Sequence, residues 1–160
     1  MTTKRISRLA IAVFAVLALG VGIAVAADVH SGTWKMNPAK SKYSPGPAQK
    51  SMTLKIEADE NGIKLDGEGV NGDDSPMHVQ YEAKFDGKEY SATGLPSGGD
   101  KITVKRVNAN TIVSTQKKDG KVLMTVTSIV SRDGKTRTST FRGKDAQGHP
   151  VHNVVVYDKE

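Results

Sequence analysis

Hydrophobic and polar residues alternate with a period of two along much of the chain after Lys50. The longest such run places five apolar residues on one face, namely Met77, Val79, Tyr81, Ala83 and Phe85. The residues between them are His78, Gln80, Glu82 and Lys84. This period is typical of an antiparallel strand that buries one face, and helical periodicity is not sustained anywhere in this part of the chain.

Shorter segments repeat the pattern at roughly ten-residue spacing, which is typical of an all-β sandwich or barrel. We expect strands at Ser31–Met36, Met52–Ile56, Ile63–Leu65, Met77–Phe85, Ile102–Val104, Thr111–Gln116, Lys121–Ser131, Thr136–Arg142 and Val151–Tyr157. Four Asx-Gly pairs separate them, at Asn61-Gly62, Asp86-Gly87, Asp119-Gly120 and Asp133-Gly134. Asx-Gly favours tight hairpins, so consecutive strands should pair.

The predicted fold is therefore all-β, an antiparallel up-and-down barrel of about 8–10 strands, because closing the sheet removes its exposed edges. A two-sheet sandwich is the second choice. Two segments interrupt the meander, Asn37–Gln49 with three prolines and the Gly-, Pro- and Ser-rich Ser91–Asp100. We expect both to be loops, which either form the rim of an open barrel mouth or are simple spacers.

The first 27 residues differ sharply from the rest. Three basic residues precede an apolar run, and Ala24-Val25-Ala26 follows it, which is the order of a secretory signal peptide. We expect residues 1–26 to be removed, with cleavage after Ala26 or Ala27, and residues 27–160 to form one domain. The alternative is an uncleaved membrane anchor. The mature protein is expected to be periplasmic or secreted, monomeric and without a stable membrane span.

Charge does not indicate a nucleic-acid partner. The chain holds 23 basic and 17 acidic residues, for a net charge of +6. Three of the basic residues lie in the leader, so 20 against 17 remain, a net +3 with the signs interspersed. The chain has no cysteine, so the fold must depend on burial and hydrogen bonding.

Two residues of the first predicted strand carry a family resemblance. Gly32 and Trp34 match the Gly-x-Trp of lipocalins, and the Gly-Thr-Trp-Lys run resembles the start of fatty-acid-binding proteins. These families form the calycin group of barrels. Tyr157 matches the Tyr of the last-strand Arg-x-Tyr in the fatty-acid-binding proteins, whereas Val155 stands where that Arg, which helps to hold a fatty-acid carboxylate, would be. The proline-rich Asn37–Gln49 is a poor match for their helical lid.

The run Asn37-Pro38-Ala39-Lys40-Ser41 is similar to the opening of the periplasmic polyisoprenoid-binding barrels, which typically have Asp-Pro-Ala-His-Ser. Both resemblances imply a small barrel that holds an apolar or amphipathic molecule.

Trp34, the only tryptophan, is expected to fill the core with its N–H hydrogen-bonded, or else to stack on a ligand. A cation over its indole ring is expected from Arg142 or Arg137. Neither face of the strand Thr136–Arg142 is wholly apolar, which favours either a cavity or a strand edge in water. The candidate ligand-binding side chains are Tyr43, Tyr81, Arg106, Arg137, Arg142 and Tyr157.

Catalytic and metal motifs are not found. His149 and His152 have a spacing that points side chains to opposite faces of a strand, so a zinc site is not expected. The acidic stretch Asp66–Asp74 lacks the spacing of a calcium loop. With no nucleophile elbow, P-loop or dinucleotide motif, we expect no enzyme activity and no cofactor.

The sequence thus predicts an exported, non-catalytic barrel that binds a small hydrophobic or amphipathic molecule. The alternative is an envelope protein-interaction module, an inhibitor or accessory factor, that uses the loops 37–49 and 91–100.

Overall fold

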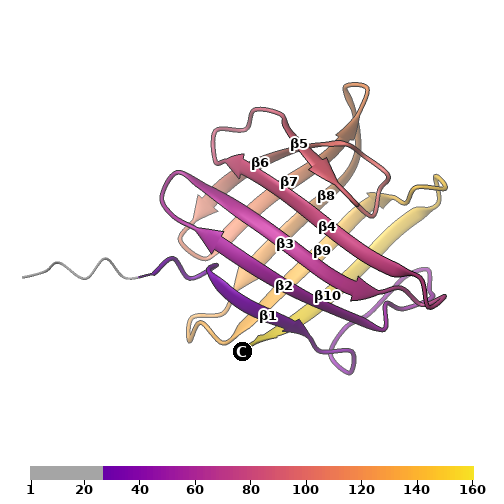
Figure 1. Ribbon diagram of the computed structural model, residues 1–160, viewed down its shortest axis with the longest axis horizontal. Coiled ribbons are helices and arrows are strands. Elements are labelled where there is room, and N and C mark those ends of the chain that lie inside the picture. Colours follow the sequence, from indigo (N-terminus) through magenta and orange to yellow (C-terminus); the bar gives the residue numbers. More distant parts are fainter. Residues whose placement is uncertain (1–26) are drawn as a thin grey trace, which may run out of the picture.

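The computed structural model describes residues 27–160, which form ten antiparallel strands (Figure 1). The strands are β1 (Gly32–Met36), β2 (Ser51–Ala58), β3 (Gly62–Val70), β4 (Pro76–Lys84), β5 (Tyr90–Thr93), β6 (Lys101–Asn108), β7 (Thr111–Lys118), β8 (Lys121–Val130), β9 (Thr136–Lys144) and β10 (Pro150–Lys159). The predicted signal peptide lies outside the described residues. No helix in residues 27–160 is long and apolar enough to cross a membrane.

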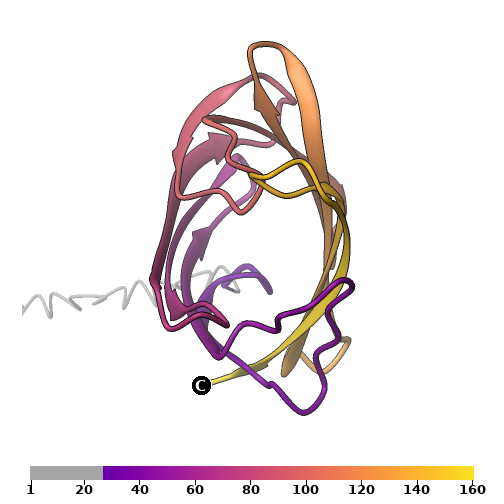
Figure 2. The ribbon, with the colours of Figure 1, turned by 90° about the vertical axis from the view of Figure 1, so that its right-hand side faces the viewer.

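Each strand pairs with its neighbours in sequence, and β1 also pairs with β10, so the sheet closes into a barrel. Figure 2 shows the strands following one another around a ring. At the seam Trp34 pairs with Lys159 and Met36 with Tyr157. The predicted up-and-down barrel is confirmed, and the two-sheet alternative is not found.

The alternation seen in the sequence separates the inside of the barrel from the outside. In β2 the buried residues are Met52, Leu54 and Ile56, and the same period recurs in β3 at Ile63 and Leu65. The Asp119-Gly120 turn between β7 and β8 has φ values of 50° and 74°, the left-handed geometry that Asx-Gly favours. Sequence therefore determines both the strand faces and this hairpin.

One prediction about the loops is partly wrong. The segment expected to be a loop at 91–100 begins within β5, a strand of four residues that pairs with β4 and β6 through two residue pairs each. Such a short strand contains too few positions to show a period of two, and the Gly- and Pro-rich residues after it dominate the local composition. The segment 37–49 contains no helix, as its prolines indicated.

The two ends of the barrel differ, and we name them by their residues. The closed end holds the turn Asp28–Ser31, which we call the N-terminal plug, together with the β2–β3, β4–β5, β6–β7 and β8–β9 turns. The mouth holds the segment 43–49 together with the β3–β4, β5–β6 and β9–β10 turns. Apolar side chains fill the closed end, among them Trp34, Ile56, Ile63, Ile112 and Val130.

Trp34 is fully buried, and its indole N–H donates to the carbonyl oxygen of His30 at 2.9 Å, which confirms the predicted core role. The predicted cover by Arg142 or Arg137 is wrong, because Lys159 places its ammonium 5.0 Å from the ring centroid. The seam register puts Lys159 beside Trp34. A Cβ at Gly32 would meet the Lys159 side chain at 2.7 Å, so this glycine leaves room for the lysine stem.

Candidate functional site: a barrel cavity with a buried arginine

A cavity of about 980 Å³ extends from the mouth into the barrel. The segment Tyr43–Gln49 and the turn residues Gly94–Pro96 both contribute to its wall. The two segments that interrupt the predicted meander therefore line the cavity, as the rim interpretation expects. The remaining rim comes from residues 71–76 and 145–149.

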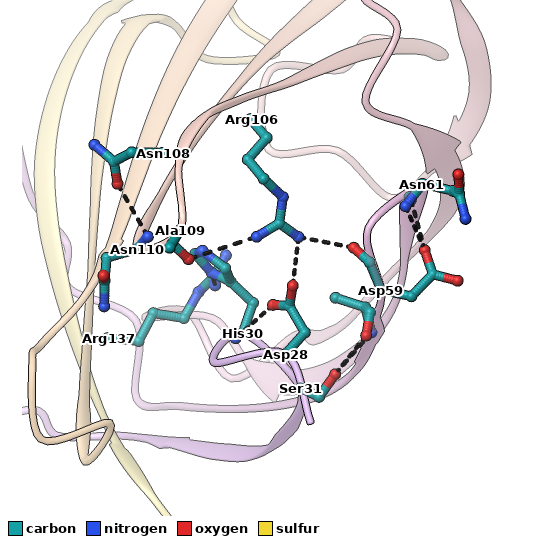
Figure 3. Close-up of polar contacts among 12 residues, drawn as sticks. Asp28, His30, Ser31, Asp59, Asn61, Arg106, Asn108, Ala109, Asn110 and Arg137 are labelled. Carbon is teal, nitrogen blue, oxygen red and sulfur yellow. Dashed lines mark hydrogen bonds and ion pairs between the residues drawn. The ribbon is translucent and has the colours of Figure 1, made fainter. Parts of the chain in front are cut away.

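Arg137 lies on the inner face of β9 and lines the cavity, although only 3% of the residue is exposed. One terminal nitrogen of its guanidinium lies 2.8 Å from Nδ1 of His30 (Figure 3). Within residues 27–160, no ion pair includes Arg137. Its Nε is also buried without a hydrogen-bond partner. The base of the cavity thus contains a cation without a carboxylate.

His30 accepts this contact in its neutral form. Burial, followed by the charge of Arg137, lowers the pKa of His30 from 6.5 to about 4. Arginine has only donors, so Nδ1 of His30 must be the acceptor, and the ring proton must then be on Nε2. That Nε2 is buried without a partner. His30 consequently orients Arg137 but supplies no negative charge to it.

Arg106, in contrast to Arg137, is paired with a carboxylate. Its guanidinium pairs with the Asp28 carboxylate at 2.6 Å, donates to the Asp59 carbonyl at 2.9 Å and lies 4.3 Å over the Phe85 ring. The contacts with Asp28 and Asp59, drawn in Figure 3, fasten the N-terminal plug to the closed end. Asp28, the carboxylate nearest in sequence to His30, is thereby paired with Arg106 and not with Arg137.

Three tyrosines line the cavity with Arg137. Burial raises the pKa of Tyr43 to about 12 and also raises the pKa values of Tyr81 and Tyr157. Their hydroxyls therefore keep their protons at neutral pH and can donate hydrogen bonds. The positive charge of Arg137 offsets part of this rise in pKa for Tyr81 and Tyr157, so both rings lie within its electrostatic reach. Burial lowers the pKa of Arg137 in turn.

Four of the six predicted ligand-binding residues thus come together in the cavity: Tyr43, Tyr81, Arg137 and Tyr157. The other two do not line it. Arg106 is bound to the plug, and Arg142 is exposed on the outside of β9.

Sequence reasoning missed four further polar residues of the cavity and also His30, which orients Arg137. Ser114, Gln116, Ser128 and Ser139 are buried polar residues that line the cavity from β7, β8 and β9. Their signal was present in the sequence as polar residues in phase with buried apolar ones, for example Gln116 in phase with Ile112. His30 precedes the first strand, so no periodicity marked it.

On the outer surface, β3 and β4 bring Asp66, Glu68 and His78 together. One ligand atom from each lies within 4.8 Å of the others, a spacing that could hold a divalent cation. Asp66 also accepts from Gln80 at 3.2 Å. His149 instead lies 3.2 Å from the carboxylate of Asp145 in the β9–β10 turn. The expectation that the protein has no metal site stays a prediction.

No family model matches the chain. No curated protein matches it either. Among solved structures it is similar to the zebrafish ileal bile acid-binding protein in complex with cholic acid, with 13% identity and a TM-score of 0.47 over 82% of this chain and 99% of that one. The strands form a closed antiparallel meander barrel, which is the architecture that the resemblance at Gly32 and Trp34 implied.

Proposed function

We propose that this protein binds one small amphipathic molecule in its barrel cavity and that the acidic group of this molecule pairs with Arg137. The observation that carries the proposal is the buried guanidinium, which lines the cavity without a carboxylate in residues 27–160. A buried charge without a counter-charge is expensive, and it is usually paired. An anion that enters from the mouth would supply the missing charge.

The rest of the lining supports an amphipathic ligand. Apolar side chains such as Met52, Leu54, Leu65 and Val79 cover much of the wall. The volume of about 980 Å³ lies at the upper end of the roughly 300–1,000 Å³ range of small-molecule sites. The cavity therefore offers enough apolar surface for a lipid-sized skeleton, with a cation near the base.

We further propose that the protein acts as an exported monomer and that the role is non-catalytic. The charged, apolar and small-residue order of residues 1–26 supports export. Positions 37–49 and 91–100, which the alternative interaction module would use, include the residues Tyr43–Gln49 and Gly94–Pro96 that line the mouth. This position favours the ligand-binding role over the alternative.

The test compares palmitate with the sixteen-carbon alcohol, which has about the same size and apolarity but no charge. The affinity of each is measured by its displacement of a fluorescent apolar probe from the protein. We expect palmitate to bind at least about tenfold tighter, because only the acid can pair with Arg137. The variant Arg137→Met should lose this preference. Arg142→Gln, a change to an exposed arginine on the same strand, should keep it.

Equal affinities for the acid and the alcohol in the unaltered protein would contradict the proposed role of Arg137. Binding of neither would contradict the ligand-binding function itself. If palmitate binds as expected, native mass spectrometry of protein recovered from its own cells identifies the natural ligand class by mass.

A further inference from the structure

The polar residues that are both buried and part of the cavity lining lie on one wall, where they alternate with the apolar Met124, Val126 and Phe141. β7 contributes Ser114 and Gln116, β8 contributes Ser128, and β9 contributes Ser139 together with Arg137. In the closed order of ten strands, β7–β9 lie across the ring from β2–β4. Figure 2 shows these two groups of strands as opposite sides of the barrel.

The opposite wall is apolar. The inward residues of β2 and β3 that line the cavity are Met52, Leu54 and Leu65, and β4 adds Met77 and Val79. Tyr81 is the one inward polar side chain among the cavity-lining residues of these three strands. The cavity thus presents an apolar face and a hydrogen-bonding face to the same occupant.

The polar wall keeps hydrogen-bonding capacity for a ligand. The hydroxyls of Ser128 and Ser139 lie 2.9 Å apart and share one hydrogen bond, which leaves one hydroxyl proton free to donate. The side-chain carbonyl oxygen of Gln116 accepts a hydrogen bond from the backbone N–H of Ser97 at 3.3 Å, which leaves the amide N–H groups of Gln116 free to donate to a ligand. A purely hydrocarbon skeleton would cover these groups without satisfying them, which is unfavourable.

We infer that the ligand is facially amphipathic: an acid whose skeleton carries hydroxyl or similar hydrogen-bonding groups along one side, facing β7–β9, with its apolar side against β2–β4. This inference rests on the proposed function, since it describes the molecule whose acidic group pairs with Arg137. A site built to hydrogen-bond a hydroxyl discriminates strongly against the analogue that lacks it, whereas a purely apolar pocket does not.

The test uses two acids of one chain length, stearate and a dihydroxystearate with hydroxyls on two adjacent mid-chain carbons. We expect the dihydroxy acid to bind the unaltered protein at least about tenfold tighter than stearate, although stearate is the more apolar of the two acids. The double variant S128A/S139A should bring the two affinities to within about twofold. Removing both partners together leaves neither hydroxyl unpaired, so this variant should fold.

The matched control is T127A/T140A. These two threonines form the neighbouring residue pair on the same two strands, outside the cavity lining, so their removal should leave the preference unchanged. Equal or weaker binding of the dihydroxy acid to the unaltered protein would overturn the inference, as would a preference that survives in S128A/S139A. If stearate binds and the dihydroxy acid does not, only this inference fails. If neither acid binds, the proposed function fails with it.

Discussion

The contact between Arg137 and His30 shows how one residue can hold a cation without neutralising it. A carboxylate at the position of His30 would form an ion pair and satisfy the guanidinium. A neutral imidazole accepts one hydrogen bond through Nδ1 and leaves the positive charge uncompensated. The pair therefore keeps Arg137 oriented and available to an anion.

The lowered pKa of His30 predicts a dependence of stability on pH. His30 takes up a proton near pH 6.5 in the unfolded chain but only near pH 4 in the fold, so the unfolded state binds more protons between these values. Stability should therefore decrease as the pH falls from about 6.5 to about 4. The loss is on the order of 2–3 kcal/mol. Urea unfolding at several pH values measures it.

His30→Gln is the variant for this test, because its amide oxygen can still accept from Arg137 while the side chain does not titrate. Its stability should change less over the same pH range. His152→Gln, at an exposed position on β10, should behave like the unaltered protein. The same slope in the His30 variant would show that other groups cause the dependence.

Trp34 is expected to serve stability and not binding, because it is fully buried at the closed end and does not line the cavity. Trp34→Ala should cost about 3–5 kcal/mol, a large part of the stability of a small domain. Trp34→Phe keeps most of the volume but leaves the His30 carbonyl oxygen without its donor, for a loss of roughly 1–3 kcal/mol. Thermal unfolding measures the loss, and palmitate affinity should not change in the Phe variant.

A Trp34→Phe protein that keeps its melting temperature but loses palmitate binding would place this residue in the ligand site instead.

At the scale of elements, sequence pattern was sufficient wherever a strand has one apolar and one polar face. The runs around Leu54, Leu65 and Val79 each became a strand with the expected side inward. Local turn chemistry at Asp119-Gly120 gave the hairpin. Together, these signals were enough to predict a meander of consecutive strands, because each depends only on residues near in sequence, whereas closure was predicted because it removes the exposed edges.

Elements whose faces are similar could not be oriented in this way. β9 has threonines on one face and Arg137, Ser139 and Phe141 on the other, so only its pairing with β8 and β10 decides which face points inward. The cover of Trp34 by Lys159 depends on the seam register between the first and last strands. Both features come from contacts between residues distant in sequence, which local pattern does not encode.

Two glycines with similar φ values allow a prediction about the β7–β8 turn and the β4–β5 contact. Gly120 in the β7–β8 turn has a φ of 74°, and an added Cβ would meet nothing within 4 Å. Gly120→Ala should therefore cost only the backbone strain, about 1 kcal/mol. Gly94, at the end of β5, has a φ of 64°, and an added Cβ would collide with the carbonyl of His78 on β4.

Gly94→Ala should lower stability by clearly more than Gly120→Ala, because the β4–β5 contact must also shift. Chemical denaturation of the two variants compares them directly. Equal losses would mean that β5 moves freely against β4.

At the scale of the whole molecule, the packed core and the cavity lie at opposite ends of one barrel. The closed end combines the buried residues around Trp34 with the Arg106–Asp28 ion pair, which lies mostly out of solvent. The cavity occupies the other end, where four loop segments form the rim. The strands run between the two ends, so a stable base can hold Arg137 in place beside the cavity.

This division predicts a gradient of hydrogen exchange along the barrel axis. Amides of the strands beside the closed end, such as those flanking Trp34 and Val130, should exchange only at rates near those of global unfolding, because they lie among buried side chains. Amides of the exposed rim segments 45–49 and 145–148 should exchange much faster. Saturating palmitate should slow exchange at the rim and in β9 near Arg137 more than at the closed end, since a ligand that closes the mouth restricts its local opening. Uniform exchange along the barrel, or protection by palmitate confined to the closed end, would contradict this assignment of stability and binding to separate ends.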